Sequence, residues 1–325
     1  MRFKYDDQID SQPAAVQSLL GARDLPKLDP SRPVIFAGLG TSLHACRIAA
    51  GWLWALSGGD LRAQAVDAHE LALRLPLTAR DQLVVVTHKT TRGFPGTALA
   101  KARAAGAATI CVCGEGAPKP EADAILRTCA DETSGTHSVS YAAALVRLAQ
   151  LVGPLCGARG RPLIEGLHDL PNLYRKALIE DPPVEQARRL QGLRALLVAG
   201  DGLDAVVAQE AALKLKEGAH AFAEGTSTEL ALHGPMTALK KGMGAVTIAP
   251  PADDGGRTAL LRAWLAEKQV AQVRCGPGEE LAFPACDPLL RPFIAVVPLQ
   301  RLAAELARLE GTDPDVAPSA PAIAT

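Results

Sequence analysis

Short apolar strands that alternate with helices are the feature that most limits how this chain can fold. In the first half of the sequence, strands are predicted at 33–37, 65–68, 82–87 and 109–113, with helices between them at 44–56, 69–75 and 97–105. The run 82–87 contains Leu-Val-Val-Val-Thr, which is typical of a strand buried on both faces of a sheet. Because such an alternation forms right-handed crossovers, we expect a parallel sheet with helices on both faces.

The second half of the chain begins in the same way as the first. The strand at 33–37 is followed by a Gly-Leu-Gly turn and a helix, and a strand predicted at 195–199 is followed by a Gly-Asp-Gly turn and a helix. Further strands predicted at 245–249, 270–273 and 293–297, with a helix at 257–268, complete a smaller parallel sheet. The sequence therefore predicts an α/β protein with two similar halves.

The length of 325 residues suits two domains of ordinary size better than one core. A helix near 170–179, in a stretch with glycine and proline at its edges, predicts the connection between them. The expected organisation is an N-terminal arm at 1–30 with one short helix at 14–20, a first domain at 31–160, a helical connection at 161–190, a second domain at 191–310 and a C-terminal tail at 311–325.

Charge and hydropathy exclude several classes of partner. The formal net charge is −1 and the chain has no basic tract, so nucleic acid is not expected as a partner. The first ten residues, MRFKYDDQID, contain no apolar signal core, and no uncharged run approaches the length needed to cross a membrane. We therefore expect a soluble, cytoplasmic protein with no membrane association.

The seven cysteines are scattered and show no C-x-x-C spacing, which fits a reduced cytosolic setting. Cys111 and Cys113 lie two residues apart in a predicted strand, so their side chains share one face. We expect this pair to fill core space rather than bind a metal.

The turn after the first strand, Gly38 to Ser42, is a candidate anion site. Backbone N–H groups and the dipole of the following helix point at such a turn. Leu43 replaces the third glycine of a dinucleotide fingerprint, so a dinucleotide is not expected. Thr41 and Ser42 could alternatively serve only as helix caps. Ligands of parallel sheets bind beyond the carboxyl ends of the strands, where this turn and the loop 88–96 both fall.

A charged helix in the second half carries the strongest chemical signal. Glu210, Lys214 and Glu217 are spaced i, i+4 and i+7 in an Ala/Leu/Lys/Glu segment, so they project from one face, and Gly218 is the expected end of this helix. A loop rich in Gly, Thr and Ser leads to His233, held before Gly-Pro by a stiff turn. The ordinary alternative is a solvent-facing ion pair worth about 0.2–0.5 kcal/mol.

The spacing of this stretch resembles that of the double sugar isomerase (SIS) domain family, which includes the isomerase half of glucosamine-6-phosphate synthase. The motif E-x-A-L-K-L-K-E stands at 210–217 and H-G-P at 233–235, and Gly-Thr-Ser at 40–42, Pro-Leu-Gln at 298–300 and G-T-D-P-D at 311–315 also match. The resemblance implies two tandem SIS domains, each a flavodoxin-like three-layer sandwich of a parallel sheet between helices.

The resemblance also implies a function. It points to a phosphosugar isomerase, or an amino-sugar deaminase or deglycase, that acts on a ketose or amino-sugar 6-phosphate through an enediolate. It implies no metal and no cofactor, and a homodimer with a shared active site. The catalytic residues that it implies are the proton-transfer base Glu217, the ring-opening His233, and Lys214 and Glu210. The substrate-binding residues are expected to be Gly40, Thr41, Ser42, Thr87, His88, Lys89, Thr90, Thr91, Arg92, His137 and Ser138.

The sequence departs from the family at two places. The family's S-Q-S-G-E-T phosphate loop is replaced from Thr87 to Arg92, where Lys89 and Arg92 could neutralise a phosphate or simply form a solvated basic loop. The lysine that the family's tail contributes is expected near Ala322, but no lysine follows Lys268.

These departures keep two alternatives open. One is a non-catalytic sugar-phosphate-binding or regulatory module, and the other is a ligand whose acidic group is not the usual phosphate. The SIS-like region begins near residue 31, so we do not expect glutaminase activity from this chain.

Overall fold

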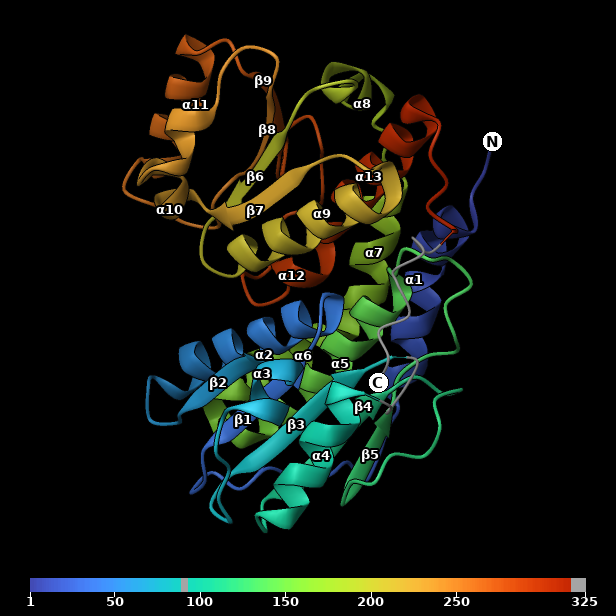
Figure 1. The fold of residues 1–325 in the computed structure, drawn as a ribbon, viewed down its shortest axis with the longest axis vertical. Helices are drawn as coiled ribbons and strands as arrows, with labels where there is room; N and C mark the ends of the chain where they lie inside the picture. Colours follow the sequence, from blue (N-terminus) through green and yellow to red (C-terminus); the bar gives the residue numbers. More distant parts are fainter. Residues whose placement is uncertain (89–92, 317–325) are drawn as a thin grey trace. The chain divides into compact units, whose positions relative to one another are not determined.

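The computed structural model describes residues 1–88 and 93–316, which form two compact units, each built around one parallel sheet (Figure 1). The β1 unit, named after strand β1 (Val34–Gly38), comprises Ala14–Glu132, apart from 89–92, and Val139–Asp169. The β6 unit, named after strand β6 (Leu196–Gly200), comprises Met1–Pro13, Thr133–Ser138 and 170–316. The predicted phosphate contacts at 89–92 and the tail after 316 lie outside the described residues.

The β1 unit has five parallel strands in the order β2-β1-β3-β4-β5. They are β1 (Val34–Gly38), β2 (Ala63–Asp67), β3 (Gln82–Thr87), β4 (Ala108–Cys113) and β5 (Ala124–Arg127). The helices are α2 (Thr41–Ser57), α3 (Ala68–Leu73), α4 (Phe94–Ala104), α5 (Val139–Leu155) and α6 (Arg161–Gly166), with short 3₁₀ turns at Gly157–Gly160 and Leu167–Asp169. This strand order is that of flavodoxin, so the predicted fold class is confirmed.

Both faces of this sheet are covered, as the apolar run in β3 predicts. Alternate residues such as Leu83 and Val85 pack with α3 and α4 in one core cluster. Their neighbours Val84 and Val86 are also buried, because α2 and α5 pack together on the other face. The layers are therefore helix, sheet and helix.

The β6 unit repeats this plan with four parallel strands in the order β7-β6-β8-β9. They are β6 (Leu196–Gly200), β7 (Ala223–Ser227), β8 (Gly244–Ile248) and β9 (Ala271–Cys275). Helix α1 (Lys4–Leu20) begins in this unit and continues into the β1 unit after Pro13. The other helices are α7 (Leu170–Leu178), α8 (Val184–Leu190), α9 (Leu203–Ala219), α10 (Thr228–Leu232), α11 (Arg257–Glu267), α12 (Arg291–Ile294) and α13 (Val296–Glu310). A 3₁₀ turn is present at Pro235–Ala238. Helices α9 and α13 pack together, and α10 and α11 share a core cluster with β6 and β8.

The glycine turns show how closely the two halves match. Gly40 and Gly202, each directly before a helix, have φ/ψ of 52°/−127° and 55°/−124°. A Cβ on Gly38 would lie 2.7 Å from the carbonyl carbon of Ser42, and one on Gly200 would lie 2.5 Å from the oxygen of Asp204. Only glycine permits this approach of helix to strand end, so the predicted duplication extends to the backbone.

Three secondary-structure predictions are wrong. The strand predicted at 293–297 is helical, since α12 and α13 are buried around most of their circumference and a short apolar run cannot reveal its period. The predicted loop after α9 contains β7, whose sequence Ala-Glu-Gly-Thr-Ser has little strand propensity but pairs at the sheet edge. The N-terminal helix begins at Lys4, well before the predicted start at residue 14.

The predicted end of the charged helix at Gly218 is also wrong. Helix α9 continues to Ala219, and His220 forms its C-cap with φ of 52°. A Cβ on Gly218 would lie 3.4 Å from Cβ of Pro314 and 3.7 Å from Oγ1 of Thr136, which are ordinary contact distances, so this glycine neither ends the helix nor is required by its neighbours.

Candidate active site

Three charged residues of α9 form a connected group inside the β6 unit. Nζ of Lys214 lies 2.6 Å from Oε2 of Glu217 and 3.4 Å from Oε1 of Glu210. The side chains of Lys214 and Glu210 are fully buried, whereas Glu217 keeps 32% of its side chain exposed. The alternative of a solvent-facing ion pair is therefore wrong, because α9 packs against β6, β7 and α13.

The electrostatics of this group suit proton transfer. One ammonium lies between two carboxylates in a region shielded from water, where charge interactions are stronger than at the surface. Of the three groups, only the Glu217 carboxylate reaches the surface, so it is the member that can exchange a proton with a ligand. The charge of Lys214 can stabilise negative charge that develops nearby.

The end of α9 is held by the last described segment of the chain. Oγ1 of Thr312 donates a hydrogen bond of 2.8 Å to the carbonyl oxygen of Gly218. The carbonyl oxygen of Pro314 accepts hydrogen bonds from Oγ of Ser134 at 3.0 Å and from the amide of Thr136 at 2.9 Å. Residues 134–136 and 312–314 therefore lie beside the residue that follows Glu217.

The same segment is anchored to the start of α1. The carboxylate of Asp315 accepts hydrogen bonds from the amides of Lys4, at 2.7 Å, and Tyr5, at 2.8 Å. The predicted contacts His137 and Ser138 directly follow Thr136 and are half-buried and buried, respectively. Four segments that are distant in sequence thus meet around the end of α9, an arrangement that no local motif reveals.

His233 does not join this group within one chain. Its side chain is 70% exposed, and its Nε2 lies 2.8 Å from Oε1 of Glu229, whose other oxygen lies 3.1 Å from Nε of Arg257. Helix α10, which ends just before His233, follows the carboxyl end of β7, whereas α9 ends shortly before β7 begins (Figure 1). A five-residue strand spans about 16 Å, so Glu217 and His233 lie at opposite ends of β7.

In the β1 unit, the predicted ligand contacts lie at the carboxyl ends of two neighbouring strands, β1 and β3. Gly40, and not Thr41 or Ser42, occupies the N-cap position of α2, so the capping alternative for those two residues is wrong. Thr87 ends β3, which is the neighbour of β1 in the sheet. Helix α2, which follows β1, and helix α4, which follows β3, cover opposite faces of the sheet. Ligands of flavodoxin-like sheets bind outside the carboxyl ends of strands whose connections diverge in this way.

His88 ties this edge to two neighbouring segments. Its carbonyl oxygen accepts a hydrogen bond of 3.1 Å from the amide of Gly114, and its Nε2 accepts one of 3.2 Å from the amide of Glu132. An oxygen of Glu132 in turn accepts a bond of 2.7 Å from the amide of Ser140. His88 is thus positioned at the carboxyl edge of the sheet.

At the equivalent strand ends of the β6 unit, the structure has a buried ion pair that the sequence analysis did not predict. Asp204 stands where the first repeat has Ser42, and its Oδ2 accepts bonds of 2.8 and 2.6 Å from Nε and Nη2 of Arg291. Nη2 also donates to the carbonyl oxygen of Ala249, just beyond β8, at 2.5 Å. Burial raises the pKa of the Asp204 carboxyl although Arg291 opposes the shift. In the sequence, the only sign of this pair is the acidic residue in the first turn of α9. Once buried, such an acid requires a partner.

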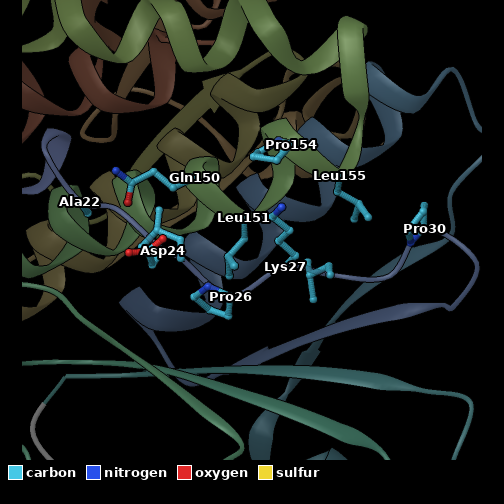
Figure 2. Close-up of a pocket in the computed structure, with 11 residues that line it drawn as sticks. Ala22, Asp24, Pro26, Lys27, Pro30, Gln150, Leu151, Pro154 and Leu155 are labelled. Carbon is cyan, nitrogen blue, oxygen red and sulfur yellow. The ribbon is translucent and has the colours of Figure 1, made fainter.

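A pocket elsewhere in the β1 unit contains none of the predicted site residues (Figure 2). It has a volume of about 340 Å³ and lies between the end of α5 and the segment that leads into β1. The residues that line it are Ala22, Asp24, Leu25, Pro26, Lys27, Leu28, Pro30, Gln150, Leu151, Pro154 and Leu155. Leucine and proline make up most of its walls, and Asp24, Lys27 and Gln150 are its charged and amide side chains.

The described residues contain neither a cluster of metal ligands nor a helix that could span a membrane. No three His, Cys, Asp or Glu side chains within 1–88 and 93–316 are grouped so that they could hold a metal ion. In the same ranges, each helix is too short or too polar to traverse a lipid bilayer.

Curated proteins similar in sequence are glutamine–fructose-6-phosphate aminotransferases (isomerizing). The one from Leifsonia xyli is 29% identical over 95% of this chain and 56% of its own length. The one from Pseudomonas putida is 30% identical over 87% of this chain and 50% of its own length. The chain thus spans about half the length of the curated relatives it matches. No protein-family model matches the chain.

Solved structures with the same fold include the C-terminal domain of glucosamine-fructose-6-phosphate aminotransferase from Francisella tularensis. It has a TM-score of 0.86, 19% identity and coverage of 97% of this chain and 99% of its own. Glucosamine-6-phosphate deaminase from Thermotoga maritima has a TM-score of 0.75 at 18% identity, covering 97% of this chain and 96% of its own. Tagatose-6-phosphate ketose/aldose isomerase from Escherichia coli has a TM-score of 0.73 at 16% identity, covering 96% of this chain and 95% of its own. At these identities the likeness shows the fold alone.

Proposed function

The chain belongs to the double sugar isomerase (SIS) domain family, and from this premise we propose that it is an enzyme acting on a ketose or amino-sugar 6-phosphate through an enediolate. The observation that carries the proposal is the buried group on α9, in which Lys214 binds both Glu210 and Glu217 and only Glu217 reaches the surface. A group of this kind costs desolvation energy that a purely structural helix would not need. The reaction is an isomerisation, a deamination or a deglycation.

The proposed chemistry needs one base and one nearby positive charge. Glu217 removes a proton from the carbon beside the carbonyl and returns it to the neighbouring carbon, so that the carbonyl moves between C1 and C2. Lys214 stabilises the negative charge of the enediolate oxygen, and Glu210 fixes the position of the Lys214 ammonium. No residue in this scheme requires a cofactor.

A second copy of the chain is part of the proposal. Ring opening needs an acid or base, and we assign it to His233. Because Glu217 and His233 of one chain lie at opposite ends of β7, the His233 that serves a given site is supplied by the partner subunit of a homodimer. The large exposed fraction of His233 leaves it accessible for that role.

The phosphate is assigned to the carboxyl edge of the first sheet. Gly40 and Thr41 provide backbone N–H groups and Thr41 and Ser42 provide hydroxyls at the start of α2, and Thr87 and His88 lie at the end of the neighbouring strand. Lys89, Thr90, Thr91 and Arg92, which lie outside the described residues, are proposed to supply the positive charge and further donors. His137 and Ser138 are proposed to line the sugar pocket, and the free cysteines fit a cytoplasmic location.

A non-catalytic sugar-phosphate-binding module is the second candidate function. The replaced phosphate loop from Thr87 to Arg92 and the absence of any lysine after Lys268 favour it. This candidate predicts binding of the same sugars without proton exchange.

Proton NMR in deuterated water distinguishes the two candidates. The purified protein is mixed in turn with fructose, glucose and glucosamine 6-phosphates and with the same sugars without phosphate. The proposed enzyme exchanges the C1 or C2 proton of at least one phosphorylated sugar for deuterium, and a known isomerase confirms that the conditions allow exchange. Line broadening without exchange would instead support the binding module. Equal line broadening of the phosphorylated and the unphosphorylated sugars would refute the proposed phosphate site at the edge of the first sheet.

A further inference from the structure

Cys111 and Cys113 belong to the core of the β1 unit, as their spacing predicts, but their surroundings are not those of inert core thiols. Both lie on β4 in the cluster that packs beneath α3 and α4, with 0% and 1% of their surfaces exposed. Because they lie two residues apart on one strand, their side chains share one face of the sheet. Cys113 is the last residue of the strand, so it lies at the carboxyl edge of the sheet.

A guanidinium group lies directly against Cys113. Nη1 of Arg127 is 3.3 Å from Sγ of Cys113, and it also donates hydrogen bonds of 2.7 Å to the carbonyl oxygen of Gly114 and 2.8 Å to that of Ala117. Among 1–88 and 93–316, no carboxylate forms an ion pair with Arg127. The positive charge is therefore fixed in place beside the sulfur by neutral partners.

The two thiols differ in acidity because of this arrangement. The hydrogen bond from Cys111 and the charge of Arg127 hold the pKa of Cys113 below the usual 9.0 for a thiol, against the effect of burial. The pKa of Cys111 is raised, because its thiol donates to Cys113 and because it is buried. A cysteine beside a cation and a second thiol shares the lowered pKa and the neighbouring thiol of redox-sensor cysteines.

Cys113 is also connected to the proposed phosphate edge. It pairs in register with Thr87 of β3, and the next residue, Gly114, donates its amide proton to the carbonyl oxygen of His88. A Cβ on Gly114 would lie 2.7 Å from that oxygen and 3.0 Å from the His88 ring, so this part of the edge has no spare room. The end of β4 is therefore coupled to His88 through this hydrogen bond and this close contact.

We propose that Cys113 is a peroxide-sensitive cysteine whose oxidation displaces Thr87 and His88 at the ligand edge. The Cys113 sulfur attacks one oxygen of hydrogen peroxide and the O–O bond breaks. The sulfur is oxidised to a sulfenic acid, and hydroxide leaves and takes up a proton to form water. The Cys111 thiol then attacks that sulfur, which forms a disulfide and releases a second water.

The geometry gives this disulfide a mechanical effect. Residues i and i+2 of a strand are about 6.6 Å apart at Cα, which is near the upper limit for a disulfide. The end of β4 must therefore shorten when the bond forms. Because a strained disulfide is easily reduced, the switch is reversible by thiols.

Peroxide titration of the purified full chain, read by peptide mass spectrometry and sulfenic-acid trapping, tests the site without any substrate. Cys113 should react first, and Cys46, which is equally buried but has a pKa raised by burial, is the internal reference. Arg127→Gln should slow the reaction at Cys113 about tenfold, the effect of roughly one pKa unit, whereas Arg127→Lys should keep most of the rate. Equal rates at Cys113 and Cys46, or an unchanged rate in Arg127→Gln, would overturn the proposal.

The effect on the ligand edge rests on the proposed function and is tested separately. Oxidised wild-type protein should lose sugar-phosphate binding measured by NMR line width and regain it with dithiothreitol, while Cys113→Ser should bind equally with and without peroxide. Binding that survives formation of the disulfide would refute the switch. If Cys113 is oxidised as predicted but no sugar phosphate binds in either state, the redox site stands and the proposed function fails.

Discussion

Nζ of Lys214 lies 2.6 Å from Oε2 of Glu217, and the lysine is fully buried while the glutamate keeps 32% of its side chain exposed. The contact directs a buried positive charge toward the one carboxylate of the group that a ligand can reach. Glu210, at 3.4 Å on the other side, keeps the ammonium from moving away. This arrangement makes Glu217 a positioned base rather than a surface carboxylate.

Replacing Lys214 should lower the stability of the protein. Lys214→Met leaves Glu210 buried without its cation, so we expect a loss of about 3–5 kcal/mol in the free energy of unfolding. Lys216→Met, on the exposed side of the same helix, is the matched control and should change stability by no more than about 0.5 kcal/mol. Urea unfolding measures both variants. Equal midpoints for the two would contradict a buried charge at Lys214.

The ion pair between Asp204 and Arg291 should behave as a unit. Asp204→Leu or Arg291→Met alone leaves a buried charge without its partner, and each should destabilise the protein by about 3 kcal/mol or more. The double variant Asp204→Leu/Arg291→Met should recover most of that loss, because burial already disfavours the ionised Asp204. A thermodynamic cycle from urea unfolding gives the coupling energy. Additive losses would show that the pair is not coupled.

Mixing two inactive variants tests the shared site. Glu217→Gln and His233→Asn should each be inactive as homodimers, but a hybrid dimer contains one site with both native residues. An equal mixture after subunit exchange should recover about a quarter of the wild-type activity, because half of the dimers are hybrids with one working site each. Native mass spectrometry confirms hybrid formation. Hybrids without activity would place Glu217 and His233 in separate roles or in one chain.

The sequence predicts the β1 unit better than the β6 unit. The strand at 82–87 is found at the predicted bounds, because a run buried on both faces has a clear apolar signal. The polar edge strand at Ala223–Ser227 and the buried helices from Arg291 onward have no such signal, since pairing and burial in the folded protein decide their form. Local sequence therefore predicts central strands well and edge or fully buried elements poorly.

The candidate site shows the same division. The spacing of Glu210, Lys214 and Glu217 predicts that they meet, because helix periodicity alone brings them together. It does not predict that this face is buried, which depends on packing of the rest of the unit. The hydrogen bond from Thr312 to Gly218 and the pairing of Arg291 with Asp204 join residues 94 and 87 positions apart, beyond the reach of any local pattern.

Deuterium incorporation into the bound sugar phosphate by Glu217→Gln tests the central claim most directly. We expect the exchange rate of the C1 or C2 proton to fall by roughly 100- to 10,000-fold, while the line broadening that reports binding remains. Glu224→Gln, an exposed carboxylate on β7, is the control and should exchange at the wild-type rate. Wild-type exchange in Glu217→Gln would show that another group moves the proton, and the assignment of Glu217 as the base would be wrong.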